Sequence, residues 1–371
     1  MSGPLKGLEV IEMAGIGPGP LAGQLLADLG ADVIVIDRAE APADKTDVNR
    51  RGKRSVFLDL KSEEGRSTAQ ALINRAGIVI EGFRPGVMER LGLGPDDLDE
   101  TVIFGRITGW GQDGPLSQSA GHDINYLGLT GALAAMGTVD NPPPPPLNLV
   151  ADYGGGTMFL LLGILAAVFE RQTSGKGQVV DAAMLDGVSA MMGLFHTFKA
   201  RGAWSENRAS NLLDGGAPFY RCYRTKDDLF MSVGPLEPQF FALLLEKAGL
   251  PAEHSVDQND PATWAERAEL YAQAFASKTQ AEWSGIFSGT DACVAPVLSM
   301  DEAASHPHMA ARQTLVEVDG VLQAANRQGS IHRRQWAGTL RRSAERCMRL
   351  RSPNEHRGGK PLPHGGCTCL I

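Results

Sequence analysis

The first forty residues combine short apolar runs with one stretch of helical periodicity. Residues 8–13 and 32–37 are rich in Val and Ile and are predicted as strands, and apolar residues recur at helical spacing over 21–29. A turn rich in Gly and Pro, 15–20, precedes this helix, and Gly30 ends it. Strand, turn, helix and strand in this order predict a βαβ unit, which typically opens a doubly wound parallel sheet.

The same alternation continues beyond residue 100. Further strands are predicted at 56–60, 78–81 and 102–105, and helices between them at 63–76 and 86–91. The N-terminal part of the chain is therefore predicted to be a large Rossmann-like α/β domain.

Two long apolar segments follow the predicted sheet. Residues 155–171 are apolar on nearly every side of a helix, so we expect this helix inside the molecule, and residues 179–193 predict a second apolar helix. The longest apolar run, 158–169, is shorter than the roughly 20 residues that cross a bilayer. The proline run 141–146 predicts a stiff surface spacer, and 200–216 lacks periodicity and is predicted to be a linker.

The pattern changes after residue 216. Strands at 219–224 and 229–233 predict a hairpin, and helices are predicted at 238–248, 264–277 and 279–288. The predicted division is a large Rossmann-like domain (1–199), a linker (200–216), a small α+β domain (217–315), and a return segment with an atypical Arg-rich tail (316–371).

Composition narrows the class of protein. The chain has 371 residues, 43% hydrophobic and 21% charged, which is typical of a globular protein with two domains. The first residues lack a secretion signal pattern and the five cysteines are scattered, so we expect a cytoplasmic protein without a disulfide framework. The net charge of −8 argues against nucleic-acid binding, and we predict neither a membrane partner nor a metal site.

The charge is unevenly distributed. Residues 326–371 contain nine Arg and one Lys against Glu345 and Glu355, a balance of +8, so the preceding 325 residues carry −16. This tail has no helical or strand periodicity, and its abrupt change of composition is typical of a shifted reading frame. We expect it to be partly disordered.

Basic residues gather near the predicted strand ends. Arg38, Lys61 and Arg84 each lie at or just after the carboxyl end of a strand, the edge where open α/β sheets bind ligands. A further group shares this part of the chain: Arg50, Arg51, Lys53, Arg54 and Arg90. A solvated surface explains such a cluster equally well. The turn 15–20 has Pro20 where a dinucleotide fingerprint needs Gly, so we predict a polyanionic, nucleotide-like ligand but no nicotinamide site.

Two segments carry candidate proton-transfer groups. His122 stands beside a carboxylate in the hexad 121–126, and Asp152 precedes three glycines and an apolar helix. An imidazole and a carboxyl group are sufficient to move a proton between the two faces of one carbon. Structural alternatives remain: His122 as a hydrogen-bonded loop residue, Asp152 as a helix N-cap, and Glu237 as a first-turn acid. The start of the helix after Asp152 would also suit a developing oxyanion.

Together these segments resemble the α-methylacyl-coenzyme A racemases of the family III coenzyme A transferase superfamily. The resemblance covers about residues 3–320 and lies mainly in these segments: 13–20, 81–86, 106–112, 121–126, 148–156 and 290–297. The family's C-terminal segment usually returns to the large domain, whereas residues 326–371 do not match it.

The resemblance implies an isomerase that interconverts (2R)- and (2S)-2-methylacyl-CoA thioesters by 1,1-proton transfer through an enolate. His122 and Asp152 would transfer the protons, and Glu237 from a second chain would orient the histidine. It also implies an interlocked homodimer whose active site lies between one chain's large domain and its partner's small domain. No separate cofactor is implied, because coenzyme A is part of the substrate. The alternatives are a coenzyme A transferase with Asp152 as covalent nucleophile, and a non-catalytic acyl-CoA-binding protein.

The coenzyme A contacts implied by the resemblance fall on four parts of the chain: Arg38; Leu58, Asp59, Leu60 and Lys61; Gly82, Phe83, Arg84 and Arg90; and Gly121, His122, Asp123, Ile124, Asn125 and Tyr126.

Overall fold

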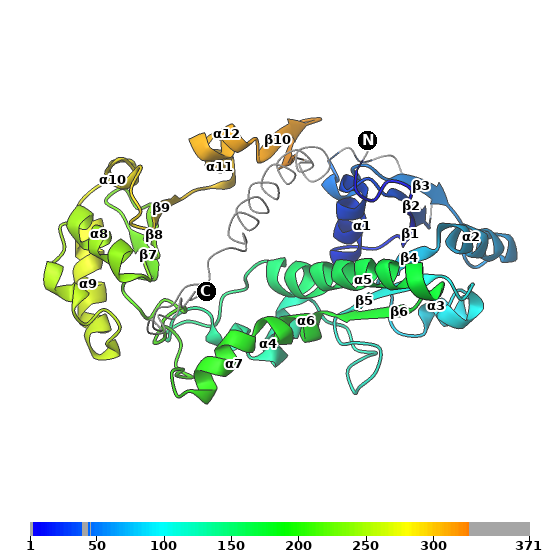
Figure 1. Ribbon diagram of the computed structural model, residues 1–371, viewed down its shortest axis with the longest axis horizontal. Helices are drawn as coiled ribbons and strands as arrows, with labels where there is room; N and C mark the ends of the chain where they lie inside the picture. The colour runs from blue at the N-terminus through cyan, green and yellow to red at the C-terminus, as the bar shows by residue number, and fades with distance from the viewer. Residues whose placement is uncertain (1–2, 39–43, 45, 326–371) are drawn as a thin grey trace, which may run out of the picture.

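A parallel sheet organises the N-terminal half of the chain (Figure 1). The computed structural model describes residues 3–38, 44 and 46–325, and the tail predicted to be disordered, 326–371, lies outside the described residues. The six strands lie in the order β3-β2-β1-β4-β5-β6, and every neighbouring pair is parallel. Their bounds are β1 Glu9–Met13, β2 Asp32–Asp37, β3 Arg54–Phe57, β4 Ile78–Glu81, β5 Ile103–Thr108 and β6 Val179–Ala183. The predicted α/β fold with a parallel sheet is confirmed.

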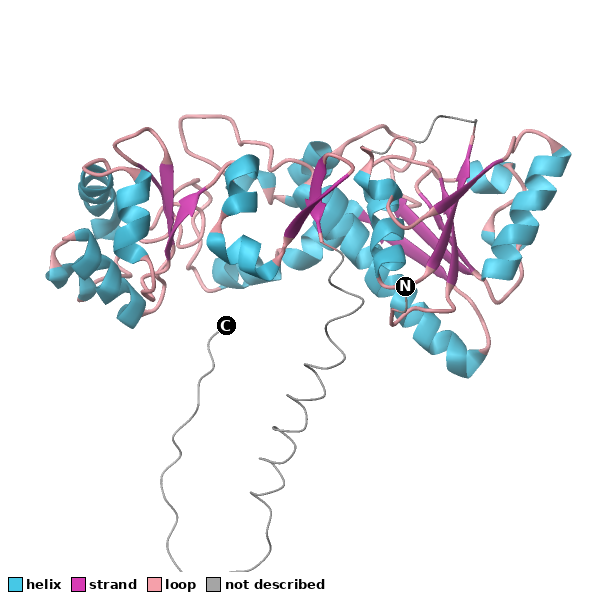
Figure 2. Cartoon of the chain, turned by 90° about the horizontal axis from the view of Figure 1, so that it is seen from above, coloured by secondary structure: helices cyan, strands magenta, loops and turns pink. Residues whose placement is uncertain are grey.

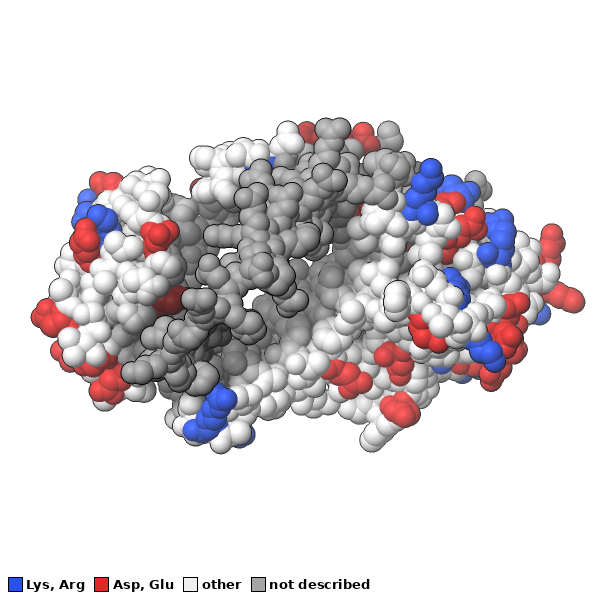
Figure 3. All heavy atoms as spheres, viewed as in Figure 1, with Lys and Arg blue, Asp and Glu red and all other residues white. Residues whose placement is uncertain are grey.

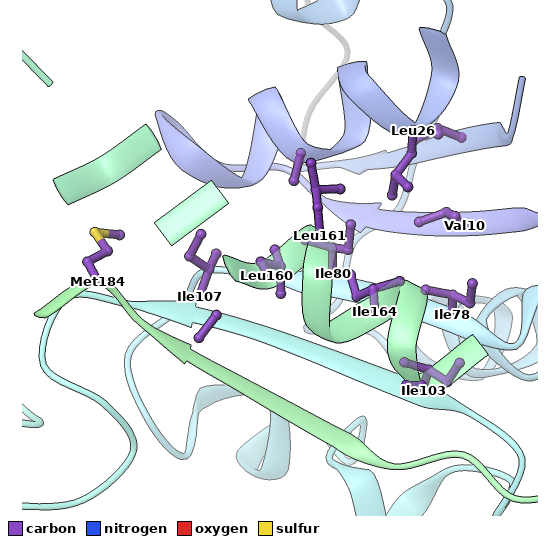
Figure 4. Packing of buried hydrophobic residues seen from close by; sticks show 14 of the residues in the cluster. Val10, Leu26, Ile78, Ile80, Ile103, Ile107, Leu160, Leu161, Ile164 and Met184 are labelled. Carbon is purple, nitrogen blue, oxygen red and sulfur yellow. The ribbon is translucent and has the colours of Figure 1, made fainter. Parts of the chain in front are cut away.

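Helices cover both faces of this sheet (Figure 2). The helices of this half of the chain are α1 Pro18–Asp28, α2 Glu63–Ala76, α3 Val87–Arg90, α4 Asp123–Thr130, α5 Met158–Ser174, α6 Met184–Met191 and α7 Gly193–Ala200. On one face, α1 and α5 pack against the strands, and Figure 4 shows Ile164 of α5 beside Ile78 and Ile103. On the other face, α2 and α3 cover the sheet. Because both faces are covered, the strands β1, β2, β4 and β5 are buried along most of their length.

The segment predicted as one apolar helix, 179–193, is instead strand β6 followed by α6. β6 pairs in parallel with β5, from Val179 opposite Phe104 to Ala183 opposite Thr108. A short apolar run fits a buried strand and a buried helix equally well, so periodicity alone cannot decide between them. The segment forms a strand because it pairs with the otherwise unpaired edge of β5.

Helix α5 differs from the prediction in its start and in its exposure. It begins at Met158 and is preceded by a π-helix over Leu149–Thr157. Its outer face is uncovered: Leu162 is 66% and Phe169 75% exposed, so the prediction that the whole helix lies inside is wrong for this chain alone. Few charged side chains lie over this face in Figure 3. By length and composition only, Leu149–Ser174 could cross a membrane, a property shared by core helices of soluble proteins.

A second, smaller structural unit follows α7. Its antiparallel sheet has the order β7-β8-β9, and helices α8, α9 and α10 pack on it around an aromatic core of Tyr271, Phe275 and Trp283. The bounds are β7 Arg221–Arg224, β8 Phe230–Val233, β9 Val294–Val297, α8 Pro238–Ala248, α9 Trp264–Phe275 and α10 Gln280–Phe287. The predicted hairpin and three helices are confirmed, whereas β9 was not predicted.

The chain then returns to the parallel sheet. The last described elements are α11 Met300–Ser305, α12 Pro307–Arg312, β10 Leu315–Val318 and β11 Val321–Ala324. Arg51 donates hydrogen bonds to Gln323 Oε1 at 2.6 Å and to the Ala324 carbonyl at 2.7 Å, which fixes the β10–β11 hairpin beside α1. The predicted domain limits at 199, 216 and 315 stay a prediction. Short 3₁₀ helices complete the described chain at Val48–Arg50, Pro95–Asp97, Leu133–Ala135, Ala252–Ser255 and Pro261–Thr263.

Candidate active site

A cavity of about 530 Å³ lies at the carboxyl edge of the parallel sheet. Residues 13–20 after β1, the end of β4, the start of α4 and the π-helix contribute to its wall. Six predicted coenzyme A contacts line it: Arg38, Gly82, Phe83, Gly121, His122 and Tyr126. Asp152 lines it as well, so both candidate proton-transfer groups face one space. This is the edge at which doubly wound sheets bind ligands.

His122 occupies the N-cap position of α4. Its backbone N–H donates to Asn125 Oδ1 at 3.0 Å, and its imidazole is exposed. Tyr126 anchors this helix, because its hydroxyl donates to the Gly121 carbonyl and its ring packs edge-on against Trp110 at 4.8 Å. The histidine therefore has a fixed backbone and a side chain open to a ligand.

Asp152 lies inside the π-helix and is not the N-cap of α5. The three glycines after it permit close packing on α6: a Cβ atom at Gly155 would lie 2.6 Å from the Met184 carbonyl oxygen, and one at Gly187 would lie 2.0 Å from that of Gly155. π-helical turns are rare and frequently occur at functional sites. The glycine run is thus explained by packing that holds Asp152 at the cavity.

The environment of Asp152 favours its neutral form. Burial, and secondly the negative charge of Asp123, raise the pKa of Asp152, while the Asn148 side chain and the charge of His122 act in the opposite direction. Gly17 lies directly beside it, because a Cβ atom there would be 3.5 Å from Asp152 Oδ2. A carboxyl group with a raised pKa is suited to donate a proton.

The helix after Asp152, where the sequence suggested an oxyanion site, has no free N-terminus, because the π-helix runs directly into α5. The N–H groups of Ala151 and Asp152 both donate to Asp123 Oδ2, each at 2.8 Å, and are therefore occupied. The first turn of α4 offers an alternative, since the N–H groups of Asp123 and Ile124 have no intrahelical acceptor.

The turn after β4 brings an arginine and an aromatic ring together in the cavity. The Arg38 guanidinium carbon lies 5.4 Å from the centroid of the Phe83 ring, and both residues line the cavity. The Phe83 N–H donates to Glu81 Oε2 at 2.7 Å, which fixes the turn. Glu81 is 4% exposed, and burial raises its pKa to about 7 although Arg106 lies 3.6 Å away.

The other predicted coenzyme A contacts lie at or near this sheet edge but outside the cavity wall. They are Leu58, Asp59, Leu60, Lys61, Arg84, Arg90, Asp123, Ile124 and Asn125. Lys61, Arg84 and Arg90 are exposed. Asp123 is 5% exposed, so its carboxylate faces the protein interior. These contacts remain a prediction.

Four basic residues of the predicted cluster form ion pairs within the chain. The pairs are Arg50–Asp37 at 2.7 Å, Arg51–Asp28 at 2.5 Å, Lys53–Glu12 at 2.6 Å, and Arg54–Asp32. The Lys53 and Glu12 side chains are only 1% and 3% exposed. These residues fasten β3 and the turn before it to β1, β2 and α1, so neither a ligand nor a solvated face is needed to explain them.

Glu237 does not line the cavity that holds His122 and Asp152. It is the N-cap residue of α8, its side chain is exposed, and its carboxylate makes no capping hydrogen bond. It lies near Cys293, whose pKa is raised by burial and then by the charges of Glu237 and Asp291. Within one chain Glu237 is therefore not brought to His122, and the predicted contact would need a second chain.

Sequence reasoning missed several residues around Asp152. Ile16, Glu81 and Asn148 lie in segments that carry the family resemblance but were not predicted as site residues. Met184 carries no pattern that marks it as a cavity residue. The bonds from the Asp123 carboxylate to the π-helix join segments 28 and 29 residues apart, which local periodicity does not reveal.

The comparisons with known proteins agree with this geometry. A family model described as CoA-transferase family III matches residues 5–344. The chain is 46% identical over 315 residues to "Alpha-methylacyl-CoA racemase" of Mus musculus and 44% identical over 317 residues to that of Homo sapiens, in each case covering 84% of this chain and 82% of the relative. The crystal structure of a CAIB/BAIF family protein from Brucella suis superposes with a TM-score of 0.71 at 26% identity, covering 87% of this chain and 92% of that one. The chain therefore belongs to CoA-transferase family III.

Proposed function

We propose that the protein is an α-methylacyl-CoA racemase that interconverts (2R)- and (2S)-2-methylacyl-CoA thioesters. The observation that carries this proposal is that an imidazole and a half-buried carboxyl group from separate elements, His122 and Asp152, line one cavity. Two relatives at 46% and 44% identity bear the racemase name.

The chemistry needs one acid and one base on opposite sides of the α carbon. The thioester carbonyl acidifies the neighbouring C–H, and neutral His122 removes this proton from one epimer while protonated Asp152 returns a proton to the other face. For the opposite epimer the roles are exchanged: ionised Asp152 removes the proton and protonated His122 returns one. Positioned acids and bases typically contribute about 10²–10⁴-fold each.

The enolate oxygen needs hydrogen-bond donors near the base. The N–H groups of Asp123 and Ile124 follow His122 at the positive end of α4, next to the cavity. An oxyanion donor of this kind contributes roughly 10²–10³-fold. The helix that presents the base therefore also supplies the oxyanion site.

The coenzyme A moiety is assigned to the same edge of the sheet. Arg38 and Phe83 line the cavity, the exposed Lys61 follows β3, and the exposed Arg84 and Arg90 follow β4. Cationic side chains beside an aromatic surface suit the phosphates and adenine of coenzyme A. The reaction involves no redox change, and coenzyme A enters as part of the substrate.

The proposal includes an interlocked homodimer. A second chain would cover the exposed apolar face of α5, including Leu162 and Phe169, and would bring its Glu237 to His122. The smaller unit is joined to the parallel sheet by two separate connections, 201–220 and 298–314, an arrangement compatible with interlocking. Analytical ultracentrifugation should give about twice the chain mass of 39.5 kDa, and a monomer at micromolar concentration would contradict this part.

Coenzyme A transfer is the second candidate, because Asp152 faces the cavity of a chain that belongs to CoA-transferase family III. In that reaction ionised Asp152 would attack the thioester carbonyl, the C–S bond would break to release the coenzyme A thiolate, and Asp152 would carry the acyl group as a mixed anhydride. The raised pKa of Asp152, caused first by burial, disfavours the ionised form, and a histidine in the same cavity has no necessary role there.

The two reactions are separated by incubating one epimer of a 2-methylacyl-CoA in D₂O without any free acid. We expect deuterium at the α carbon together with inversion. Exchange of coenzyme A that appears only when a free carboxylic acid is added would support the transferase and contradict the racemase. Binding of the thioester without either reaction would favour a non-catalytic acyl-CoA-binding protein.

A further inference from the structure

Asp123 is a buried carboxylate beside the candidate active site that the proposed chemistry does not use. We propose that Asp123 is a positioning residue, whose carboxylate ties the segment carrying the base to the segment carrying the acid and keeps the acid in its proton-donating form. This inference rests on the proposed racemase function, because it assigns Asp123 a role towards His122 and Asp152.

The hydrogen bonds of Asp123 connect the two segments directly. The residue follows His122 in the chain and begins α4, and its Oδ2 accepts from the N–H groups of Ala151 and Asp152, each at 2.8 Å. One oxygen atom thus joins the neighbour of the base to the main chain of the acid itself. The separation between imidazole and carboxyl group therefore depends on this contact.

The Asp123 carboxylate is buried without a cationic partner among the described residues. Asp123 is 5% exposed, its Oδ1 has no hydrogen-bond partner within the part of the chain that the structure describes, and no described cationic side chain forms an ion pair with it. An unpaired buried carboxylate is costly. An asparagine would offer the same acceptor to both N–H groups without an ionic charge, so the fold alone does not account for the carboxylate.

The charge of Asp123 acts on Asp152. The groups that face Asp152 are Asp123 and Tyr126 from α4, His122 at its N-cap, and Asn148 before the π-helix. After burial, Asp123 is the principal cause that raises the pKa of Asp152, and it opposes His122 and Asn148. Its negative charge therefore helps Asp152 to keep a proton.

This electrostatic role predicts a shift in the pH profile of racemisation. The active pair carries one proton, held by Asp152 in one direction and by His122 in the other, so kcat/KM falls when that proton is lost and when a second one binds. In Asp123→Asn the negative charge is removed while an acceptor oxygen remains. Both limbs of the profile should move to lower pH, by about one unit.

The test compares Asp123→Asn and Asp123→Ala with a matched control, Asp260→Asn. Asp260 also accepts a backbone hydrogen bond through its carboxylate, from the Ala262 N–H at 3.0 Å, but lies in the smaller unit and outside the cavity wall. We expect Asp123→Asn to keep KM within about threefold and to shift the profile. Asp123→Ala, which loses the tether, should lower kcat by about 10²-fold, as expected for a displaced catalytic group. Asp260→Asn should retain the parent profile.

A merely structural role for Asp123 predicts a lower melting temperature with an unshifted profile in Asp123→Asn, and this result would overturn the inference. Asp123→Asn is isosteric and stays decisive if Asp123→Ala does not fold. Following the Asp152 carboxyl by ¹³C NMR in the parent and in Asp123→Asn gives a readout independent of turnover. A parent without exchange would contradict the proposed function, whereas an active parent with no change in the variant's profile or titration would contradict only the role of Asp123.

Discussion

Two clusters of charged residues in the large α/β region are built in opposite ways. In the β1–β3 corner, formed by β1, β2, β3 and residues 48–53 before β3, the buried carboxylate of Glu12 meets Lys53, and Asp37 meets Arg50. At the α4–π-helix junction, formed by residues 121–126 and 148–157, no described Lys or Arg pairs with Asp123 or Asp152. Carboxylates in the β1–β3 corner form ion pairs that hold the fold together. Carboxylates at the α4–π-helix junction are left without a cationic partner.

The difference shows where chemistry can occur. Burial raises the pKa of Glu12 to about 7 even beside Lys53, but this side chain is only 3% exposed and is bonded to the lysine. Asp152 also has a raised pKa, but it faces a cavity in which a ligand can exchange a proton with it. Density of charge along the sequence does not distinguish the two cases. The partner of each charge and its access to the cavity do.

The largest expected effect on stability concerns the buried pair of the β1–β3 corner. Lys53→Ala would leave Glu12 buried without its partner, and removal of one partner of a buried pair costs about 3–5 kcal/mol. Urea denaturation of the parent and the variant measures this cost. The double variant Glu12→Gln/Lys53→Met should recover more than half of the lost free energy of unfolding. An exposed pair is worth about 1 kcal/mol. If the free energy of unfolding of Lys53→Ala lies within that amount of the parent's, the buried pair is assigned wrongly.

Glu81 provides an intermediate effect that depends on pH. Burial raises its pKa from 4.5 to about 7 in the folded protein, so its contribution to stability is fully present below pH 4.5 and is lost as the pH rises through 7. The free energy of unfolding of Glu81→Gln, relative to that of the parent, should therefore increase by on the order of 3 kcal/mol between pH 4.5 and 8. Urea denaturation at several pH values measures this difference, and a flat difference would show that Glu81 is not buried as described.

The smallest effect is expected for the exposed pair of the same corner. Arg54 and Asp32 form an ion pair, but their side chains are 62% and 45% exposed, and exposed pairs typically contribute less than about 1 kcal/mol. Arg54→Ala should therefore change the free energy of unfolding by less than 1 kcal/mol. A loss as large as that of Lys53→Ala would mean that burial does not separate the two pairs.

Much of the large α/β fold could be predicted from local signals. Helix α2 was predicted with its observed bounds because Ser62 caps its start, accepting from the Gly65 N–H at 3.0 Å, and Gly77 ends it with a φ of 71°. β6 was mistaken for helix because its pairing with β5 comes from a distant segment. The π-helix was missed because its packing on α6 depends on tertiary contacts at glycines.

The candidate site was predictable as residue types but not as an arrangement. His122 and Asp152 stand out as an imidazole and a carboxyl group beside glycines, and the structure places both at one cavity. The ion pairs of Arg50, Lys53 and Arg54 and the bonds of Asp123 join distant segments, so sequence spacing did not reveal which charges are neutralised.

The most direct test of the two-group mechanism follows α-hydrogen exchange of each pure epimer in D₂O with Asp152→Asn and His122→Ala. Asp152→Asn should still exchange the epimer that faces His122, His122→Ala should exchange only the other epimer, and inversion should fall at least about 10²-fold in both. Inversion at the parent rate in either variant, or exchange of both epimers by one of them, would contradict the account.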